Sequence, residues 1–341
     1  MKGRLTVYNK ITDEEKIKKI NPENVQLVGD FLDYLASIDR SPQTIEGYRN
    51  DLEIFFVWNE ETNDNKEFIK ITKREFARFQ NHALNEWKWS PSRIRRVKSA
   101  ISSLSNYIEN MLDEEEGYED YRSVIRKIES PANEAVREKT ILSPEEVQHL
   151  LDVLVEKKKY QKAVCVAILA YSGMRRAELL QMKMEYFEPD RLEFGCLYKT
   201  DKVRAKGRGV RGKQINKYVM NKVDPYMDLW RKEREENGID SEYVFVTNNN
   251  GVWERRTNIN HWKEELSDII GKPFYFHALR HALCTELCQK NIPAEVIREF
   301  FQWQSVEMIT HYNDASAADE FGKYFSEDGI IEQTSKGITD I

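Results

Sequence analysis

The chain has 341 residues, of which 40% are hydrophobic and 32% are charged. This length predicts two domains with real hydrophobic cores and a charged surface. No apolar run approaches the roughly 20 residues that a membrane helix needs, and the polar N-terminal segment is neither a signal nor a transit peptide. Four scattered cysteines do not form a disulfide framework, so we expect a cytoplasmic protein with no membrane partner.

The net charge of −6 argues at first sight against a nucleic-acid partner, but the charge is unevenly distributed. The segment after Tyr312 carries a net −5, whereas cations concentrate in residues 93–98 and 199–217. Either basic stretch alone is also compatible with an ordinary solvated surface. If the partner is a nucleic acid, we predict that its phosphates contact Arg93, Arg95, Arg96, Lys98, Lys199, Lys202, Arg204, Arg208 and Arg211.

In chain order, residues 1–21 show no clear period and are predicted to be an N-terminal extension. Apolar residues at helical spacing predict helices over 26–37, from 42 and over 71–87. A fourth helix begins at 91 and carries the first basic stretch. Ser41-Pro42 and Ser90-Pro91 are typical helix starts, with serine as N-cap and proline at the first helical position. Residues 22–130 are therefore predicted to be a small all-helical domain with one cationic helix.

Residues 131–140 read as a linker before a second domain, predicted over 141–325 and followed by an acidic tail, 326–341. Ser143-Pro144 starts a helix, and residues 160–171 form a buried one. Strand-like composition over 191–204 and 214–220 flanks a turn at Lys206-Gly207-Arg208-Gly209, which predicts a β-hairpin. Helical patterns resume at 224, 258 and 277. The expected fold class is mainly α with a small β-sheet: a helical domain followed by an α+β domain.

Four separated patterns are candidates for chemistry. In residues 172–178, a glycine ends the buried helix and Arg175 opens the next, beside backbone N–H groups suited to anions. Glu178 follows three residues later and is placed to hold that guanidinium. In the second pattern, His277, Arg280 and His281 share one helical face. The third and fourth patterns are Trp303, after two phenylalanines, and His311-Tyr312 at the end of a short helix.

Each pattern also has an ordinary structural explanation. Arg175 could be only an ion-pair partner of Glu178, and the histidine-containing face could be solvated. Trp303 alone would more commonly be a core residue. Tyr312 is one of 16 tyrosines and carries no signal by itself.

Together and in this order, the patterns resemble the tyrosine recombinase, or phage integrase, family. Gly173, Arg175 and Glu178 match its first motif, and His277 and Arg280 match its His-x-x-Arg motif, with His281 following. Trp303 stands where members have His or Trp, and Tyr312 follows at the family's spacing. The segment Ser41 to Tyr48 also resembles the family's core-binding domain, so the resemblance implies a helical core DNA-binding domain over residues 22–130. The resemblance covers about residues 22–312.

The resemblance further implies a catalytic lysine in a β-hairpin turn. Lys206, before Gly207, best matches that context, because a turn can reach into the minor groove. Lys199 better matches the usual distance from Arg175, and Lys202 lies between the two. The sequence therefore favours Lys206 and leaves the other two open.

The implied activity is site-specific cleavage and rejoining of double-stranded DNA through a 3′-phosphotyrosine at Tyr312. Arg175, Lys206, His277, Arg280 and Trp303 would complete the catalytic set, with Glu178 and His281 in support. No cofactor and no metal are implied. The resemblance implies a homotetramer on DNA and leaves room for an accessory directionality or DNA-bending protein.

Three other interpretations are compatible with part of these patterns. A type IB topoisomerase-like nicking-closing enzyme shares the chemistry, and a non-catalytic DNA-binding regulator would need only the basic patches. A zinc module is suggested by His281, Cys284 and Cys288 near one helical face. Structural zinc usually takes four ligands with paired-knuckle spacing, so we interpret both cysteines as small core residues.

Overall fold

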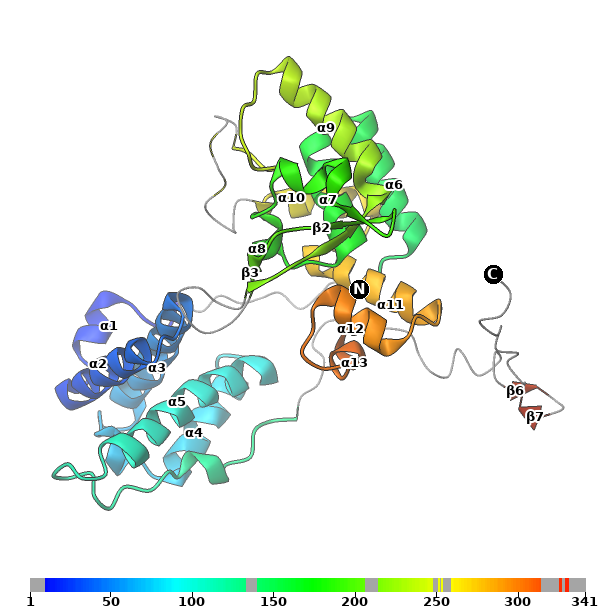
Figure 1. The fold of residues 1–341 in the computed structure, drawn as a ribbon. Helices are drawn as coiled ribbons and strands as arrows, with labels where there is room; N and C mark the ends of the chain where they lie inside the picture. Colours follow the sequence, from blue (N-terminus) through cyan, green and yellow to red (C-terminus); the bar gives the residue numbers. More distant parts are fainter. Residues whose placement is uncertain are drawn as a thin grey trace. The chain divides into compact units, whose positions relative to one another are not determined.

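The structure is a computed structural model, and it describes residues 10–132, 140–205, 214–247, 251, 253 and 259–313, with the backbone of 325–326 and 329–330. The chain divides into two compact units, and the boundary in sequence lies at residues 138–139. Figure 1 labels the α-helices of each unit and some of the strands. The units are described separately below.

The first unit is helical. Its elements are α1 (Glu14–Lys18), α2 (Pro22–Ser37), α3 (Pro42–Thr62), η1 (Phe68–Lys70), α4 (Lys73–Asn85), α5 (Pro91–Met111) and η2 (Ile125–Lys127). The side chains of Ser41 and Ser90 accept hydrogen bonds from backbone N–H groups three residues later, as the two Ser-Pro starts predicted. Helix α3 packs against α1, α2 and α5 around a core rich in aromatic residues. Helix α1 precedes residue 22, where we placed the start of this domain, and Ile20 is buried in its core.

The second unit contains helices around a small sheet. Its helices are α6 (Pro144–Glu156), α7 (Tyr160–Ser172), α8 (Arg176–Leu179), η3 (Met184–Phe187), η4 (Pro189–Arg191), η5 (Asn221–Val223), α9 (Asp224–Glu236), α10 (Trp262–Ile270), α11 (Phe276–Gln289), α12 (Ala294–Phe301) and α13 (Met308–Tyr312). Helix α7 is the centre of this unit, since it contacts α6, α8, α9 and α11. Residues 163–168 of α7 have no exposed surface, which explains their uniformly small and apolar composition.

The predicted hairpin is present, and each of its two sides consists of two short strands instead of one. A three-stranded antiparallel sheet has the order β1 (Leu192–Glu193), β2 (Leu197–Lys199), β5 (Tyr218–Met220). Beyond it, β3 (Val203–Arg204) pairs with β4 (Gln214–Ile215), so that β2–β3 and β4–β5 form the two arms of one ribbon. The expected turn at 206–209 lies outside the described residues. Near the C-terminus, β6 (Phe325–Ser326) pairs with β7 (Gly329–Ile330).

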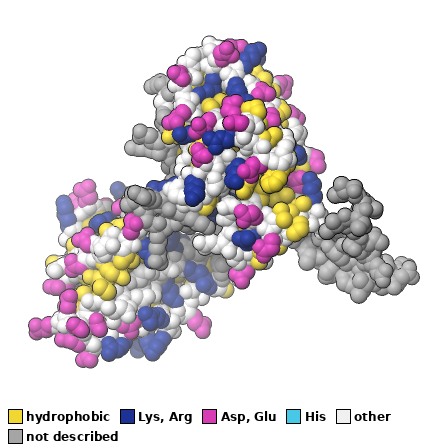
Figure 2. Space-filling model, viewed as in Figure 1, with side chains coloured by type: hydrophobic (Ala, Val, Ile, Leu, Met, Phe, Trp, Pro, Cys, Tyr) yellow, Lys and Arg dark blue, Asp and Glu magenta, His cyan; other side chains and the backbone are white. Residues whose placement is uncertain are grey.

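The predicted fold class, mainly helical with a small antiparallel sheet, is confirmed. Acidic and basic side chains are interspersed on the face of the molecule shown in Figure 2. Within the described residues, no helix has the length and apolar character needed to cross a membrane.

Candidate active site

The turn that carries Arg175 depends on a glycine. Helix α7 ends at Ser172, and Gly173 adopts φ +57°, the left-handed conformation that favours glycine. A Cβ atom at this position would lie 2.2 Å from Cε1 of Phe301, so any other residue would force the Phe301 ring to move. Arg175 is the N-cap residue of α8, and both its backbone N–H and its guanidinium donate to the Glu178 carboxylate, at 2.8 and 3.2 Å.

One face of α11 meets the phenol ring of Tyr312. His277 Nε2 lies 3.2 Å from the Tyr312 hydroxyl. The ring centroid of His281 is 4.9 Å from that of Tyr312, and Cζ of Arg280 is 4.9 Å from the same ring. Arg280 also donates through Nη1 to the carbonyl of Gly173, which connects α11 to the Arg175 turn. The three residues predicted to share a helical face therefore all contact one tyrosine.

Three aromatic rings form a stack beside Arg280. The centroids of Phe301 and Trp303 are 4.4 Å apart with a 9° interplanar angle, and those of Trp303 and Tyr312 are 5.1 Å apart with a 20° angle. Cζ of Arg280 lies 4.8 Å from the Phe301 ring and 5.1 Å from the Trp303 ring. Trp303 is buried and packs against its neighbours, as expected if it were an ordinary core residue. It also lies directly against the tyrosine, as the family pattern implies.

The site holds buried donors without acceptors. Nε and Nη2 of Arg280 and Nε1 of Trp303 are buried and have no hydrogen-bond partner among the described residues. An unpaired buried donor costs roughly 1–3 kcal/mol, so such donors mark a place where a ligand can supply the acceptor. Burial and the neighbouring Arg175 lower the pKa of Arg280 to about 10, and the guanidinium remains charged at pH 7. The site therefore fits an anion with several oxygens.

The electrostatic environment keeps His277 neutral. Partial burial of the ring is the largest cause, and together with the nearby Arg280, His281 and Arg175 it lowers the pKa of His277 to about 4. At neutral pH the imidazole thus carries no charge and has a nitrogen able to accept a proton. Since that ring lies at hydrogen-bonding distance from the Tyr312 hydroxyl, the geometry suits proton transfer from the phenol.

Sequence reasoning missed the part that Lys217 plays in this site. We counted Lys217 only as one cation of the second basic stretch, yet it is 1% exposed and forms an ion pair of 3.0 Å with Glu178, which is equally buried. A signal was present in the sequence. Lys217 alternates with the apolar residues Ile215 and Val219, and a period of two places all three on the inner face of a strand.

The candidate lysines have different surroundings. Lys199 forms an ion pair with Glu193 (2.9 Å) and lies over the Tyr218 ring, so it is held against the sheet. Lys202 and Arg204 are exposed. Lys206, Arg208 and Arg211 lie outside the described residues, and the assignment of the catalytic lysine to Lys206 stays a prediction.

The cations of α5 have partners within the helical unit. Arg93 and Arg96 both pair with the buried carboxylate of Asp51, at 2.5 and 3.0 Å. Arg95 donates to the carbonyl of Pro131, and Lys98 donates to that of Ile128. These contacts give the first basic stretch a structural role. DNA contacts by the same residues stay predictions.

Among the described residues, no group of three His, Cys, Asp or Glu side chains could hold a metal ion. Cys284 is buried and Cys288 partly buried in the cluster that contains Trp303 and Tyr312. Both cysteines therefore lie in a core, as we interpreted them.

Comparison with known proteins identifies the family. Residues 140–319 match the model of the Phage integrase family, and residues 27–115 match that of the Phage integrase, N-terminal SAM-like domain. The SPbeta prophage-derived recombinase-like protein YomM of Bacillus subtilis (strain 168) is 29% identical over 310 residues, 89% of this chain and 88% of that protein.

Solved structures agree in fold. The XerH site-specific recombinase bound to palindromic difH substrate matches with a TM-score of 0.65 at 19% identity, over 89% of this chain and 96% of that one. A lambda integrase tetramer bound to a Holliday junction matches with a TM-score of 0.62 at 14% identity, over 90% and 82% of the two chains. Since the family match spans more than half of the sequence, the protein belongs to the phage integrase family, the tyrosine recombinases, enzymes that cleave and rejoin DNA.

Proposed function

We propose that Tyr312 is the nucleophile of a site-specific recombinase and that it forms a 3′-phosphotyrosine with one DNA strand. The observation that carries this assignment is the 3.2 Å contact between the Tyr312 hydroxyl and His277 Nε2, beside the buried guanidinium of Arg280. A phenol must lose its proton as it attacks. The neutral imidazole of His277 accepts that proton.

The cations of the site act on the phosphate. A phosphodiester resists nucleophiles because its non-bridging oxygens are negative, and paired guanidinium groups neutralise them. Arg175 and Arg280 take this role, and the unpaired indole N–H of Trp303 donates to a phosphate oxygen. Charge on these oxygens rises in the transition state, so fixed donors stabilise it preferentially.

The bond changes balance without an added nucleotide. The Tyr312 oxygen bonds to phosphorus while the bond from phosphorus to the 5′ oxygen breaks. The leaving oxygen needs a proton, which Lys206 supplies in this scheme. Rejoining reverses these steps with a new 5′ hydroxyl, because the covalent link conserves the energy of the phosphodiester.

A nicked DNA substrate tests the proposal: after cleavage the short fragment that carries the free 5′ hydroxyl diffuses away, so that rejoining is prevented and the covalent adduct is trapped. We expect Tyr312→Phe to bind the DNA but to form no adduct. Tyr226→Phe, which removes a hydroxyl from the same unit away from the site, is the control and should form adduct normally. Adduct formation by Tyr312→Phe would refute the assignment.

The domain assignments remain part of this proposal. We propose that residues 22–130 are a core DNA-binding domain and that residues 141–325, with an acidic tail at 326–341, form the catalytic domain. The two would close around duplex DNA, and the binding constant would fall steeply with salt because phosphate contacts dominate. Binding that is independent of salt would contradict this.

Self-association on DNA is also proposed. The lambda integrase structure to which this chain is similar is a tetramer on a Holliday junction, and we propose the same assembly here, in the cytoplasm. Mass measurement of the complex on a synthetic four-way junction tests it, and a stable monomer on that junction would exclude it. The accessory directionality or DNA-bending protein stays a prediction.

A further inference from the structure

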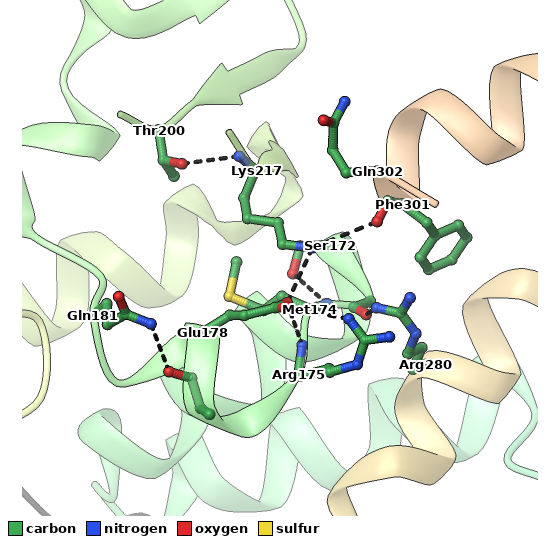
Figure 3. Close-up of polar contacts among 12 residues, drawn as sticks. Ser172, Met174, Arg175, Glu178, Gln181, Thr200, Lys217, Arg280, Phe301 and Gln302 are labelled. Carbon is green, nitrogen blue, oxygen red and sulfur yellow. Dashed lines mark hydrogen bonds and ion pairs between the residues drawn. The ribbon is translucent and has the colours of Figure 1, made fainter. Parts of the chain in front are cut away.

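Lys217 links the three segments that build the active site. Its backbone belongs to the hairpin, where its N–H donates to Thr200 Oγ1 (2.9 Å) and its carbonyl accepts from the Thr200 N–H (2.9 Å). Its side chain runs inward, and Nζ contacts Glu178 Oε2 at 3.0 Å and the carbonyl of Phe301 at 3.5 Å (Figure 3). One buried ammonium thus contacts both the α8 turn and the segment that leads to Trp303.

Glu178 is the residue through which Lys217 reaches Arg175. The same oxygen, Oε2, accepts from the backbone N–H of Arg175 at 2.8 Å, and Oε1 lies 3.2 Å from Arg175 Nη1. Burial opposes ionisation of Glu178, but Lys217 and the Arg175 N–H together lower its pKa below the ordinary value. Glu178 is therefore a buried anion held between two cations.

The balance of charge determines what Arg175 can do. A buried carboxylate with Arg175 as its single cationic partner would neutralise that guanidinium and draw it inward. Lys217 supplies the compensating charge from the other side, and 31% of the Arg175 side chain remains exposed. Arg175 thus contacts Glu178 for orientation while the local charge remains positive.

We infer that Lys217 is a positioning residue for strand cleavage, which neutralises Glu178 so that Arg175 keeps its charge and orientation for the scissile phosphate. The inference rests on the proposed function, in which Arg175 binds that phosphate. Lys217 acts through Glu178 and Arg175, and it also fixes the Phe301 carbonyl beside the aromatic stack. It therefore differs from the lysine that protonates the leaving oxygen.

The test compares Lys217→Met, which preserves chain length and removes the charge, with the double variant Lys217→Met/Glu178→Gln. Adduct formation on nicked DNA is followed in a single turnover at saturating DNA, and DNA affinity and thermal unfolding are measured separately. Lys183→Met is the matched control, because its ion pair with Glu242 (2.6 Å) lies at the surface of the same unit.

We expect Lys217→Met to slow adduct formation by about 100-fold, the order of loss for a displaced catalytic group. The double variant should recover part of that rate, since the uncompensated carboxylate is gone. A wild-type rate in Lys217→Met, or no recovery in the double variant, would overturn the inference. If wild type itself forms no adduct at Tyr312, the proposed function fails instead.

A second substrate separates positioning from proton donation. With sulfur in place of the bridging 5′ oxygen, the leaving group needs no proton, so a variant lacking only the general acid regains its rate. We expect no such recovery for Lys217→Met. Full recovery would make Lys217 the proton donor and refute the positioning role.

Lys217→Arg provides a second test, which can still be carried out if Lys217→Met does not fold. Burial lowers the pKa of Lys217 to about 8, with Glu178 opposing the shift and Arg280 and Arg175 adding to it. Wild type should therefore lose cleavage rate as pH rises through about 8, and Lys217→Arg should not. An identical pH profile in the two proteins would overturn the inference.

Discussion

Substitution of Gly173 by alanine tests how tightly the catalytic turn is built. Two separate costs are expected. At φ +57° a Cβ is strained by about 1–2 kcal/mol. In addition, that atom would lie 2.2 Å from the Phe301 ring, far inside van der Waals contact, and forced overpacking costs about 1–3 kcal/mol. The expected loss in the free energy of unfolding is therefore about 2–5 kcal/mol.

The chain contains a matched control for the strain alone. Gly271 ends α10 in the same unit with φ +69°, and a Cβ there would have no atom within 4 Å. Gly271→Ala should therefore lose only the cost of the left-handed backbone, about 1–2 kcal/mol. Urea denaturation of both full-length variants measures the difference, which we attribute to the Phe301 contact.

The same clash should also reduce activity. Phe301 stacks on Trp303, and the Gly173 carbonyl accepts from Arg280. A displaced ring would thus disturb two groups assigned to the phosphate, and Gly173→Ala should slow adduct formation while Gly271→Ala should not. Equal destabilisation by the two substitutions, with equal activity, would refute the steric reasoning.

Three further predictions follow from the site and the helical unit. Trp303→Phe retains a ring in the stack but removes the buried N–H, so adduct formation should fall by about 100-fold. The control is Trp253→Phe, which removes another buried indole N–H that has no partner among the described residues. This control variant should cleave normally. Asp51→Asn removes the buried carboxylate that Arg93 and Arg96 share, and we expect urea denaturation to show a loss of about 1–3 kcal/mol, the order of a charged hydrogen bond. Glu46→Gln, in an exposed pair, should show almost none. In the DNA-free protein, NMR should show His277 titrating near pH 4. The His277 resonance is assigned by its absence from the spectrum of His277→Gln. The imidazole binds its proton near pH 6.5 in the unfolded chain but only near pH 4 in the folded protein. The free energy of unfolding should therefore decrease as pH falls from about 6.5 to about 4. A His277 titration midpoint near 6.5 in the folded protein would contradict the described environment.

Local signals in the sequence predicted most of the helices. Serine followed by proline starts α3, α5 and α6, and the structure shows each serine side chain accepting a backbone N–H. These signals are readable because capping depends on residues three positions apart. The His277, Arg280 and His281 face was also predictable, since helical periodicity alone places those residues together.

The anionic partner of each cation could not be predicted in the same way. A guanidinium or ammonium pairs equally well with a carboxylate of the protein or with a phosphate of DNA. Arg93 and Arg96 read as DNA-binding residues, yet both contact Asp51, which lies more than 40 positions away in the chain. Only the packing of α3 against α5 brings that carboxylate within reach.

Lys217 shows why the site needed coordinates as well as motifs. The family pattern marks residues that touch the phosphate, and each such residue has an identity that chemistry requires. A residue that supports them is constrained only by charge and burial, and its partner is set by the fold. Glu178 is three residues from Arg175, so its role was readable. Lys217 reaches the same carboxylate from the hairpin, 39 positions later in the chain. Since its effect on cleavage passes through Glu178, substituting both residues together is the measurement that separates charge compensation from simple packing.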